Sequence, residues 1–251
     1  MNHKISVIII CKNEEKRIRQ CLESIKWADE IVLLDSGSTD NTLAIAREYT
    51  DKIFVNTEWQ GFGHQKRLAE SHASNDWVLA IDSDEVISEK LHEEIIEAIK
   101  SADEKEVFRF NRLTHFCGKY IKHSGWYPDR IVRLYNKKHY HYNNAIVHEA
   151  VDCKGAQITD LKEAFFHYTN DTLEAYINKR NGYALVWAES QYKKGRRTNF
   201  VEIILHTFFA FIRHYIFRLG FLDGYHGFLI SIIQMQYTFN KYNFLMFKYR
   251  K

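Results

Sequence analysis

Apolar and polar positions along the first hundred or so residues follow two alternating periods. Continuous runs of branched aliphatic residues predict strands buried on both faces, and apolar residues three and four positions apart predict amphipathic helices. The predicted strands cover residues 5–10, 30–35, 52–56 and 76–82, and the predicted helices cover residues 13–25, 42–49, 63–74 and 88–102. Strands and helices that alternate over short connections predict an α/β fold, with a parallel sheet covered by helices and right-handed crossovers.

Residues 200–249 follow a helical period throughout. One broad apolar face is predicted over residues 200–216, and it consists of Ile203, Ile204, Phe208, Phe211, Ile212, Tyr215 and Ile216. A second apolar segment covers residues 228–241. Because polar and charged residues interrupt both segments, no apolar run reaches the roughly 18 residues that suggest a transmembrane helix, and none is expected. Residues 2–4 lead directly into the first strand, so no signal peptide is expected either.

Charge is distributed unevenly along the chain. The whole chain has a net charge of +3, but residues 192–251 hold ten basic and two acidic residues, which leaves residues 1–191 at −5. Basic residues among aromatic ones favour helices that lie in a bilayer interface beside anionic lipid. The alternative is that these helices pack on a catalytic domain or on a second subunit of a homo-oligomer. Too many apolar residues separate the bases to form a phosphate track, so no nucleic-acid partner is expected.

Composition and cysteine spacing narrow the class of protein. With 45% hydrophobic and 27% charged residues, the chain resembles an ordinary soluble globular protein. Cys11, Cys21, Cys117 and Cys153 show no C-x-x-C spacing. They favour buried thiols in a reducing compartment, and a cytoplasmic location is predicted. The sequence also lacks both the G-x-G-x-x-G fingerprint and the P-loop motif.

Acidic residues gather where the fourth predicted strand ends. Asp82, Asp84 and Glu85 fall within four positions, and each carboxylate raises the cost of ionising its neighbours unless a cation is present. A turn or a helix N-cap is the alternative explanation. Asp35 ends the second strand and residues 11–13 follow the first, and parallel sheets bind ligands at this edge. The Asp-x-Asp spacing there predicts a Mg²⁺ or Mn²⁺ site that holds a diphosphate.

Three motifs in order, SVIIICKNEE, EIVLLDSGSTDNT and DWVLAIDSDE, resemble glycosyltransferase family 2, the inverting GT-A enzymes that use nucleotide-diphosphate sugars. The resemblance implies a Rossmann-like, mostly parallel sheet flanked by helices. We expect a catalytic domain at residues 1–191 and a C-terminal amphipathic, basic helical region at residues 192–251. Later segments are similar to bacterial enzymes that add glucose to heptose in the inner core of lipopolysaccharide or lipooligosaccharide; they cover residues 125–137, 143–151, 166–184 and 219–228.

The resemblance also implies partners and site residues. The donor would be UDP-glucose, the acceptor a lipid-linked core oligosaccharide, and the enzyme peripheral on the inner face of the bacterial inner membrane. A divalent metal, Mg²⁺ or Mn²⁺, would bind Asp84, Asp82 and His167, although His167 could instead be a hydrogen-bonded core residue. Glu85 would orient the metal site or contact the sugar. The implied nucleotide-binding residues are Cys11, Lys12, Asn13, Glu14, Asp35, Lys66, Asp82 and Ser83.

Inversion needs a base that takes the proton of the acceptor hydroxyl. The resemblance suggests Glu149, and Asp129, beside Pro128, is the alternative. Glu149 could also be a surface carboxylate paired with a lysine. Arg130 and Arg133 would either clamp a phosphate or belong to a solvated charged face.

Three other functions compete with this one. A family 2 transferase could use another sugar or another acceptor. A nucleotidyltransferase that makes nucleotide sugars usually has a glycine-rich loop after its first strand, where this chain has CKNEEKRI. A membrane- or sugar-binding module without catalysis would not need Asp82 and Asp84, and both are present.

Overall fold

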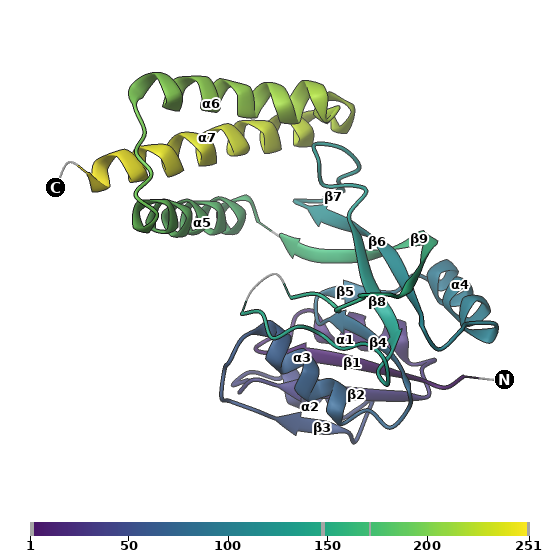
Figure 1. Ribbon diagram of the computed structural model, residues 1–251. Coiled ribbons are helices and arrows are strands. Elements are labelled where there is room, and N and C mark those ends of the chain that lie inside the picture. Colours follow the sequence, from purple (N-terminus) through teal and green to yellow (C-terminus); the bar gives the residue numbers. More distant parts are fainter. Residues whose placement is uncertain (1–2, 147–148, 171, 250–251) are drawn as a thin grey trace. The chain divides into compact units, whose positions relative to one another are not determined.

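The chain folds into two compact units, shown as a computed structural model in Figure 1. The structure describes residues 3–146, 149–170 and 172–249. The first unit consists of Met1–Arg112 and Asp129–His167, and the second consists of Leu113–Pro128 and Tyr168–Lys251.

The described strands belong to one mixed sheet. Strands β1 to β4 pair in parallel in the order β3-β2-β1-β4, and the order continues as β8-β6-β9-β5, with β7 paired to β6. The pairs β4–β8, β6–β8, β5–β9 and β6–β7 are antiparallel. The strands are β1 Ile5–Cys11, β2 Glu30–Asp35, β3 Ile53–Val55, β4 Trp77–Asp82, β5 Glu85–Val86, β6 Glu106–Phe116, β7 Lys119–Tyr120, β8 Arg130–Asn136 and β9 Gln157–Asn170. The predicted α/β fold is confirmed, with the parallel strands forming one half of the sheet and the antiparallel strands the other.

Helices cover both faces of the parallel strands, because these strands are apolar on both sides. Ile5, Val7 and Ile9 of β1 share a core with α1, α2 and α4, whereas Ile8 and Ile10 share a second core with α3. These helices are α1 Ile18–Ile25, α2 Thr42–Ala46, α3 Phe62–Ser71 and α4 Glu89–Lys100. The loops that follow β1, β2 and β4 lie at the carboxyl ends of these strands.

Helix α1 is shorter than predicted. The pattern predicts a helix from residue 13, but α1 begins at Ile18. The backbone N–H groups of Asn13 and Glu14 instead donate to Ser38 Oγ at 2.9 Å and Thr42 Oγ1 at 2.8 Å. Residues 13–17 therefore belong to the loop that follows β1.

Three long helices make up most of the second unit. Helix α7 packs against both α5 and α6 (Figure 1). A π-helical turn, η1, and a 3₁₀ turn, η2, connect α6 to α7. The elements are α5 Leu173–Lys193, α6 Phe200–Ile212, η1 Arg213–Phe217, η2 Gly220–Asp223 and α7 Tyr225–Lys248.

The two units do not follow the domain boundary predicted at residues 191 and 192. Helix α5 continues through that position without interruption. Residues 113–128 also belong to the second unit, because Phe116 and Ile121 are buried in one cluster with Tyr176 and Ile230. Packing, and not the change in net charge along the chain, determines where the units divide.

The single apolar face predicted for residues 200–216 divides into two faces. Ile203 is buried, whereas Phe208, Ile212 and Ile216 are exposed. Within the described residues, one helical segment, Phe200–Phe217, has the length and composition to cross a membrane, with a mean hydropathy of 1.4. No transmembrane helix was expected there, because polar residues interrupt the apolar run. These polar residues do not, however, lower the average hydropathy of the segment below that of a possible membrane span.

Candidate active site

The loops after β1 and β2 are tied to each other at the edge of the sheet. Cys11 and Asp35 are partners in the parallel register. Asn13, with a left-handed φ of 55°, accepts a 2.8 Å hydrogen bond at Oδ1 from the backbone N–H of Thr39. Together with the bonds from Asn13 and Glu14 to Ser38 and Thr42, this contact holds residues 11–14 in a defined loop. Lys12 and Asn13 are exposed on it.

Asp35 organises the second of these loops. Its carboxylate is fully buried and accepts hydrogen bonds at Oδ2 from the backbone N–H groups of Gly37 and Ser38, each at 2.8 Å. The Ser38 hydroxyl and the Cys11 thiol also donate to Oδ1. Burial and the nearby charge of Asp35 raise the pKa of Cys11 well above its usual range, so this thiol stays protonated. Both oxygens of Asp35 therefore bind the loop itself.

The acids at the end of β4 have cationic partners from two other elements. Arg133, on β8, donates from Nη2 to Asp82 Oδ2 at 2.6 Å and to Glu85 Oε1 at 2.7 Å. Lys66, on α3, lies 2.8 Å from Asp82 Oδ1. Burial alone would raise the pKa of Asp82, but the charges of Arg133 and Lys66 outweigh it and hold that pKa well below its usual range.

Glu85 orients Asp82. The side chain of Glu85 is completely buried, and its Oε2 accepts a 2.9 Å hydrogen bond from the backbone N–H of Asp82. Of its two predicted roles, the geometry matches orientation of the site, since a carboxylate with no exposed surface does not meet a sugar. Ser83, between the acids, is also buried.

Asp84 lies apart from this network. Its Oδ2 is 3.4 Å from His167 Nε2, and its side chain is 23% exposed. His167 is adjacent because it pairs with Glu85 across β5 and β9. Burial and the charge of Asp84 raise the pKa of Glu14 to about 7. Negative charge is therefore crowded around Asp84. The ammonium of Lys66 and the guanidinium of Arg133 contact the neighbouring Asp82.

A cavity of about 490 Å³ opens beside Asp82 in the first unit. Both predicted bases line it. Glu149 contacts Lys66 Nζ through Oε1 at 2.9 Å, and Asp129 contacts Arg112 Nη2 through Oδ2 at 2.7 Å. The Glu149 side chain is 16% exposed and that of Asp129 40%. The lysine pairing considered for Glu149 is present, but it lies in the cavity wall and not on an open surface. Val147 and His148, which precede Glu149, lie outside the described residues.

The sequence pattern alone did not predict that Lys66 and Arg133 pair with the acids at the end of β4. Arg133 is 4% exposed and is bound to Asp82 and Glu85, so it does not belong to a solvated charged face. Arg130 is half exposed and pairs with Asp160 at 3.2 Å. The signal in the sequence was the crowding of acids at residues 82–85, which requires cations, but nothing in the pattern shows which strand supplies them.

Replacing Arg133 by methionine should lower the free energy of unfolding by about 3–5 kcal/mol, because Asp82 and Glu85 lose their shared cation inside the protein. Chemical denaturation followed by circular dichroism measures the change. Arg109→Met is the matched control, since Arg109 lines the same cavity but forms a partly exposed pair with Asp160; it should cost less than about 1 kcal/mol. Equal losses in the two variants would contradict a structural role for Arg133.

Comparison with known proteins identifies the family of this chain. Residues 6–165 match the family model described as glycosyl transferase family 2. An uncharacterized glycosyltransferase of Rickettsia typhi is 34% identical over 242 residues, which cover 92% of this chain and 82% of that protein. The lipopolysaccharide core biosynthesis glycosyltransferase LpsC of Rhizobium meliloti is 30% identical over 246 residues, which cover 94% of this chain and 89% of LpsC.

Among solved structures, residues 1–349 of S. aureus TarS match with a TM-score of 0.46 at 17% identity, covering 98% of this chain and 91% of that one. Glucosyl-3-phosphoglycerate synthase from Mycobacterium tuberculosis, in complex with Mg²⁺ and UDP, matches with a TM-score of 0.37 at 24% identity, covering 45% and 44% of the two chains. The family match spans well over half of the chain and contains the ends of β1, β2 and β4. The chain belongs to glycosyl transferase family 2.

Proposed function

We propose that this glycosyltransferase transfers glucose from UDP-glucose, with inversion, to a heptose in the inner core of lipopolysaccharide or lipooligosaccharide. Its main support is the arrangement at the end of β4, where Asp84 is partly exposed beside His167 and the cavity next to Asp82 is lined by two candidate bases. The motifs over residues 125–228 favour the glucose donor and the heptose acceptor. LpsC, a relative along nearly the whole chain, is itself a core biosynthesis glycosyltransferase.

The donor site would be the edge formed by the loops after β1, β2 and β4. Lys12 and Asn13 are exposed there. Asp35 holds the adjoining turn by accepting hydrogen bonds from the backbone N–H groups of Gly37 and Ser38. In this proposal the nucleotide contacts the backbone of residues 11–14, and Asp35 acts through the turn that it holds. The charges of Arg133 and Lys66 keep Asp82, at the end of β4, ionised.

A divalent cation fits the residues around Asp84. No three His, Cys, Asp or Glu side chains among the described residues are grouped to hold a metal ion by themselves. Mg²⁺ in nucleotide enzymes, however, typically takes one or two protein carboxylates and completes its shell with phosphate oxygens and water. Asp84 would hold the ion, with His167 as a second ligand that suits Mn²⁺. When bound, the ion neutralises charge on the leaving diphosphate.

Within the cavity, a carboxylate of this chain would take the proton of the acceptor hydroxyl as the new bond forms. Glu149 is the proposed base, since its Oε1 lies 2.9 Å from Lys66, the residue that also contacts Asp82. Lys66 therefore connects Glu149, in the wall of the cavity proposed to hold the acceptor, to Asp82, at the proposed donor site. Asp129 lines the same cavity and is the second candidate.

Transfer of radiolabelled sugar to purified core acceptor tests the proposal. The acceptor would be a core that ends in unsubstituted heptose, and UDP-glucose would be compared with UDP-galactose and UDP-N-acetylglucosamine. Transfer from UDP-glucose alone, giving a glucose–heptose linkage of inverted configuration by NMR, is the expected result. Preferential transfer from another donor would overturn the sugar assignment, and transfer only to an acceptor without heptose would overturn the acceptor.

A further inference from the structure

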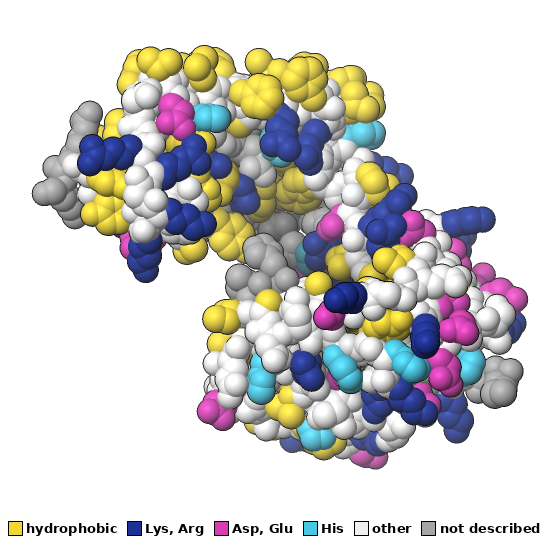
Figure 2. Space-filling view, in the orientation of Figure 1, with side chains coloured by type: hydrophobic (Ala, Val, Ile, Leu, Met, Phe, Trp, Pro, Cys, Tyr) yellow, Lys and Arg dark blue, Asp and Glu magenta, His cyan; other side chains and the backbone are white. Residues whose placement is uncertain are grey.

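The outer side of α6 and η1 is an exposed stripe of large apolar side chains, here called the α6 face. Figure 2 shows hydrophobic side chains gathered over the helices of the second unit. Several of them are more than 60% exposed, including Phe200, Leu205 and Phe208. The α6 face consists of Phe200, Val201, Leu205, Phe208, Phe209, Ile212, Ile216 and Phe217. Members at residues 201, 205, 208, 212 and 216 repeat at helical spacing, so they lie along one side.

The opposite side of α6 is already occupied. Ile203 and Thr207 are buried, and His206 stacks on Tyr242 of α7 with ring centroids 4.9 Å apart. Only 11% of the window Phe200–Phe217 is buried in the protein. The helix therefore keeps one side against α7 and leaves a broad apolar side without a partner among the described residues.

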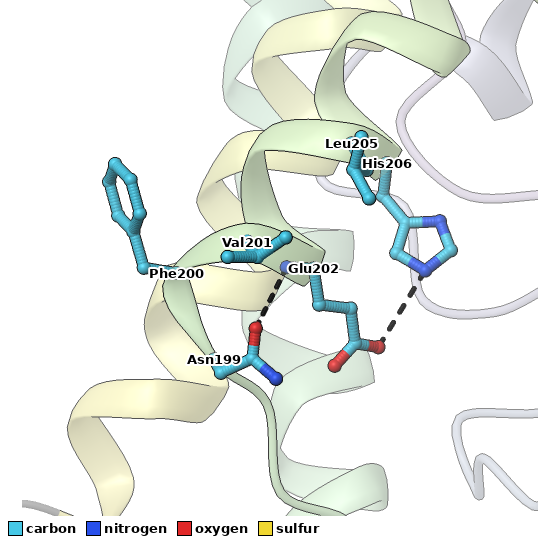
Figure 3. Close-up of a pocket in the computed structure, with 6 residues that line it drawn as sticks. All are labelled: Asn199, Phe200, Val201, Glu202, Leu205 and His206. Carbon is cyan, nitrogen blue, oxygen red and sulfur yellow. Dashed lines mark hydrogen bonds and ion pairs between the residues drawn. The ribbon is translucent and has the colours of Figure 1, made fainter.

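Two polar side chains of α6, Glu202 and His206, approach each other, and Glu202 also pairs with a neighbouring arginine. Figure 3 shows its first turns, where Asn199 caps the backbone N–H of Glu202 at 2.9 Å and Glu202 approaches His206 at 3.6 Å. Arg196 also lies 2.8 Å from Glu202. This pairing leaves the α6 face itself without an unpaired acid.

The charges around the α6 face have one sign. Between residues 193 and 225, the exposed Lys, Arg, Asp and Glu side chains are all basic: Lys193, Lys194, Arg197, Arg213 and Arg218. The two acids in this range are Glu202, which is ion-paired, and Asp223, which is 3% exposed. An apolar surface with only basic exposed charges complements a bilayer that contains anionic lipid.

We propose that the α6 face docks the protein on an anionic membrane surface, with α6 lying in the interface. A second copy of the chain is a poorer occupant, because a two-fold contact would bring the same basic residues of both copies together. A helix that spans the bilayer would have to leave its packing on α7, whereas an interfacial helix keeps it. The inference does not depend on the identity of the donor or acceptor sugar.

Sedimentation of the full-length protein with vesicles tests the docking. The vesicles would be phosphatidylcholine alone, or phosphatidylcholine with about a third of phosphatidylglycerol. We expect binding to the anionic vesicles that weakens with salt, and at least a roughly tenfold loss of affinity in Leu205→Asp/Phe208→Asp. Replacing Lys194 and Arg213 by glutamine should reduce binding to anionic vesicles by roughly fivefold for each base removed.

Val186→Asp is the matched control, because Val186 is a 68% exposed apolar residue on α5 of the same unit. It should bind vesicles like the unmodified protein, and circular dichroism should show all variants folded. Absence of vesicle binding would overturn the proposal, as would equal losses in the α5 and α6 variants. It is also overturned if light scattering shows a dimer that only the α6 variant dissociates, or if membrane-bound protein resists alkaline extraction as a spanning helix does.

Discussion

Replacing Asp84 by alanine is expected to lower turnover by about three orders of magnitude or more and to leave the fold intact. Asp84 is a partly exposed acid of the strand-end cluster, and its Oδ2 lies 3.4 Å from His167 Nε2. Charge stabilisation by a bound divalent ion contributes several kcal/mol to a transition state of this kind, and Asp84 is its proposed ligand. Sugar-transfer rates at saturating donor, with thermal unfolding measured beside them, test the expectation.

The matched control for this variant is Asp76→Ala. Asp76 directly precedes β4, at the other end of the strand, and its side chain pairs with Lys138 while being 47% exposed. Its loss should leave turnover unchanged and alter stability by less than about 1 kcal/mol. An Asp84→Ala protein that transfers sugar at the normal rate would remove Asp84 from the catalytic site.

Replacing Glu149 by glutamine should leave UDP binding unchanged and reduce transfer by about 10²- to 10⁴-fold, the usual effect of removing a general base. Glutamine keeps the shape of the side chain and can still accept a hydrogen bond from Lys66, so the cavity wall should be preserved. Single-turnover rates together with UDP affinity separate the loss of chemistry from a loss of binding.

Asp129→Asn is the comparison for this second variant, because Asp129 lines the same cavity and pairs there with Arg112. Transfer should persist in Asp129→Asn if Glu149 is the base. Normal transfer by Glu149→Gln together with loss in Asp129→Asn would reassign the base to Asp129. Normal transfer by both variants would show that neither carboxylate takes the proton.

The parallel half of the fold was predictable because its strands are buried on both sides. Continuous apolar runs such as Val32–Leu34 have no other stable position in a soluble domain, and β1, β2 and β4 form close to where the pattern predicts them. Strands β6, β8 and β9 were not predicted. Their residues mix buried, partly buried and exposed positions and include the partly exposed Arg109 and the half-exposed Arg130, so their hydrophobic signal is weaker.

The sequence predicted which strand ends form the candidate site, but it did not predict the contacts between the side chains there. Asp35 and Asp82 come at the carboxyl ends of β2 and β4, the two parallel strands that flank β1, and topology alone then brings their loops to one edge. The contacts of Arg133 are different, because it lies 51 residues from Asp82 in sequence and reaches it only through the antiparallel pairing of β8 with β4. Glu149 reaches Lys66 across 83 residues. No local pattern encodes these pairings.

The sequence predicted that α6 has an apolar face, but it did not predict which apolar residues lie on the exposed side of the helix. A period of 3.6 residues places Ile203 and Phe208 in one apolar set, yet the structure buries the first and exposes the second. Residue type does not distinguish an apolar side chain that meets α7 from one that meets solvent or lipid. Only the position of the neighbouring helix makes that distinction.

Calorimetric titration of UDP-glucose into the purified protein, with Mn²⁺ and then with EDTA, tests the central claim most directly. We predict saturable binding with Mn²⁺ that EDTA removes and that Asp84→Ala lacks, while Asp76→Ala binds normally. Absence of UDP-glucose binding with the metal present would contradict a nucleotide-sugar site at the ends of β1, β2 and β4.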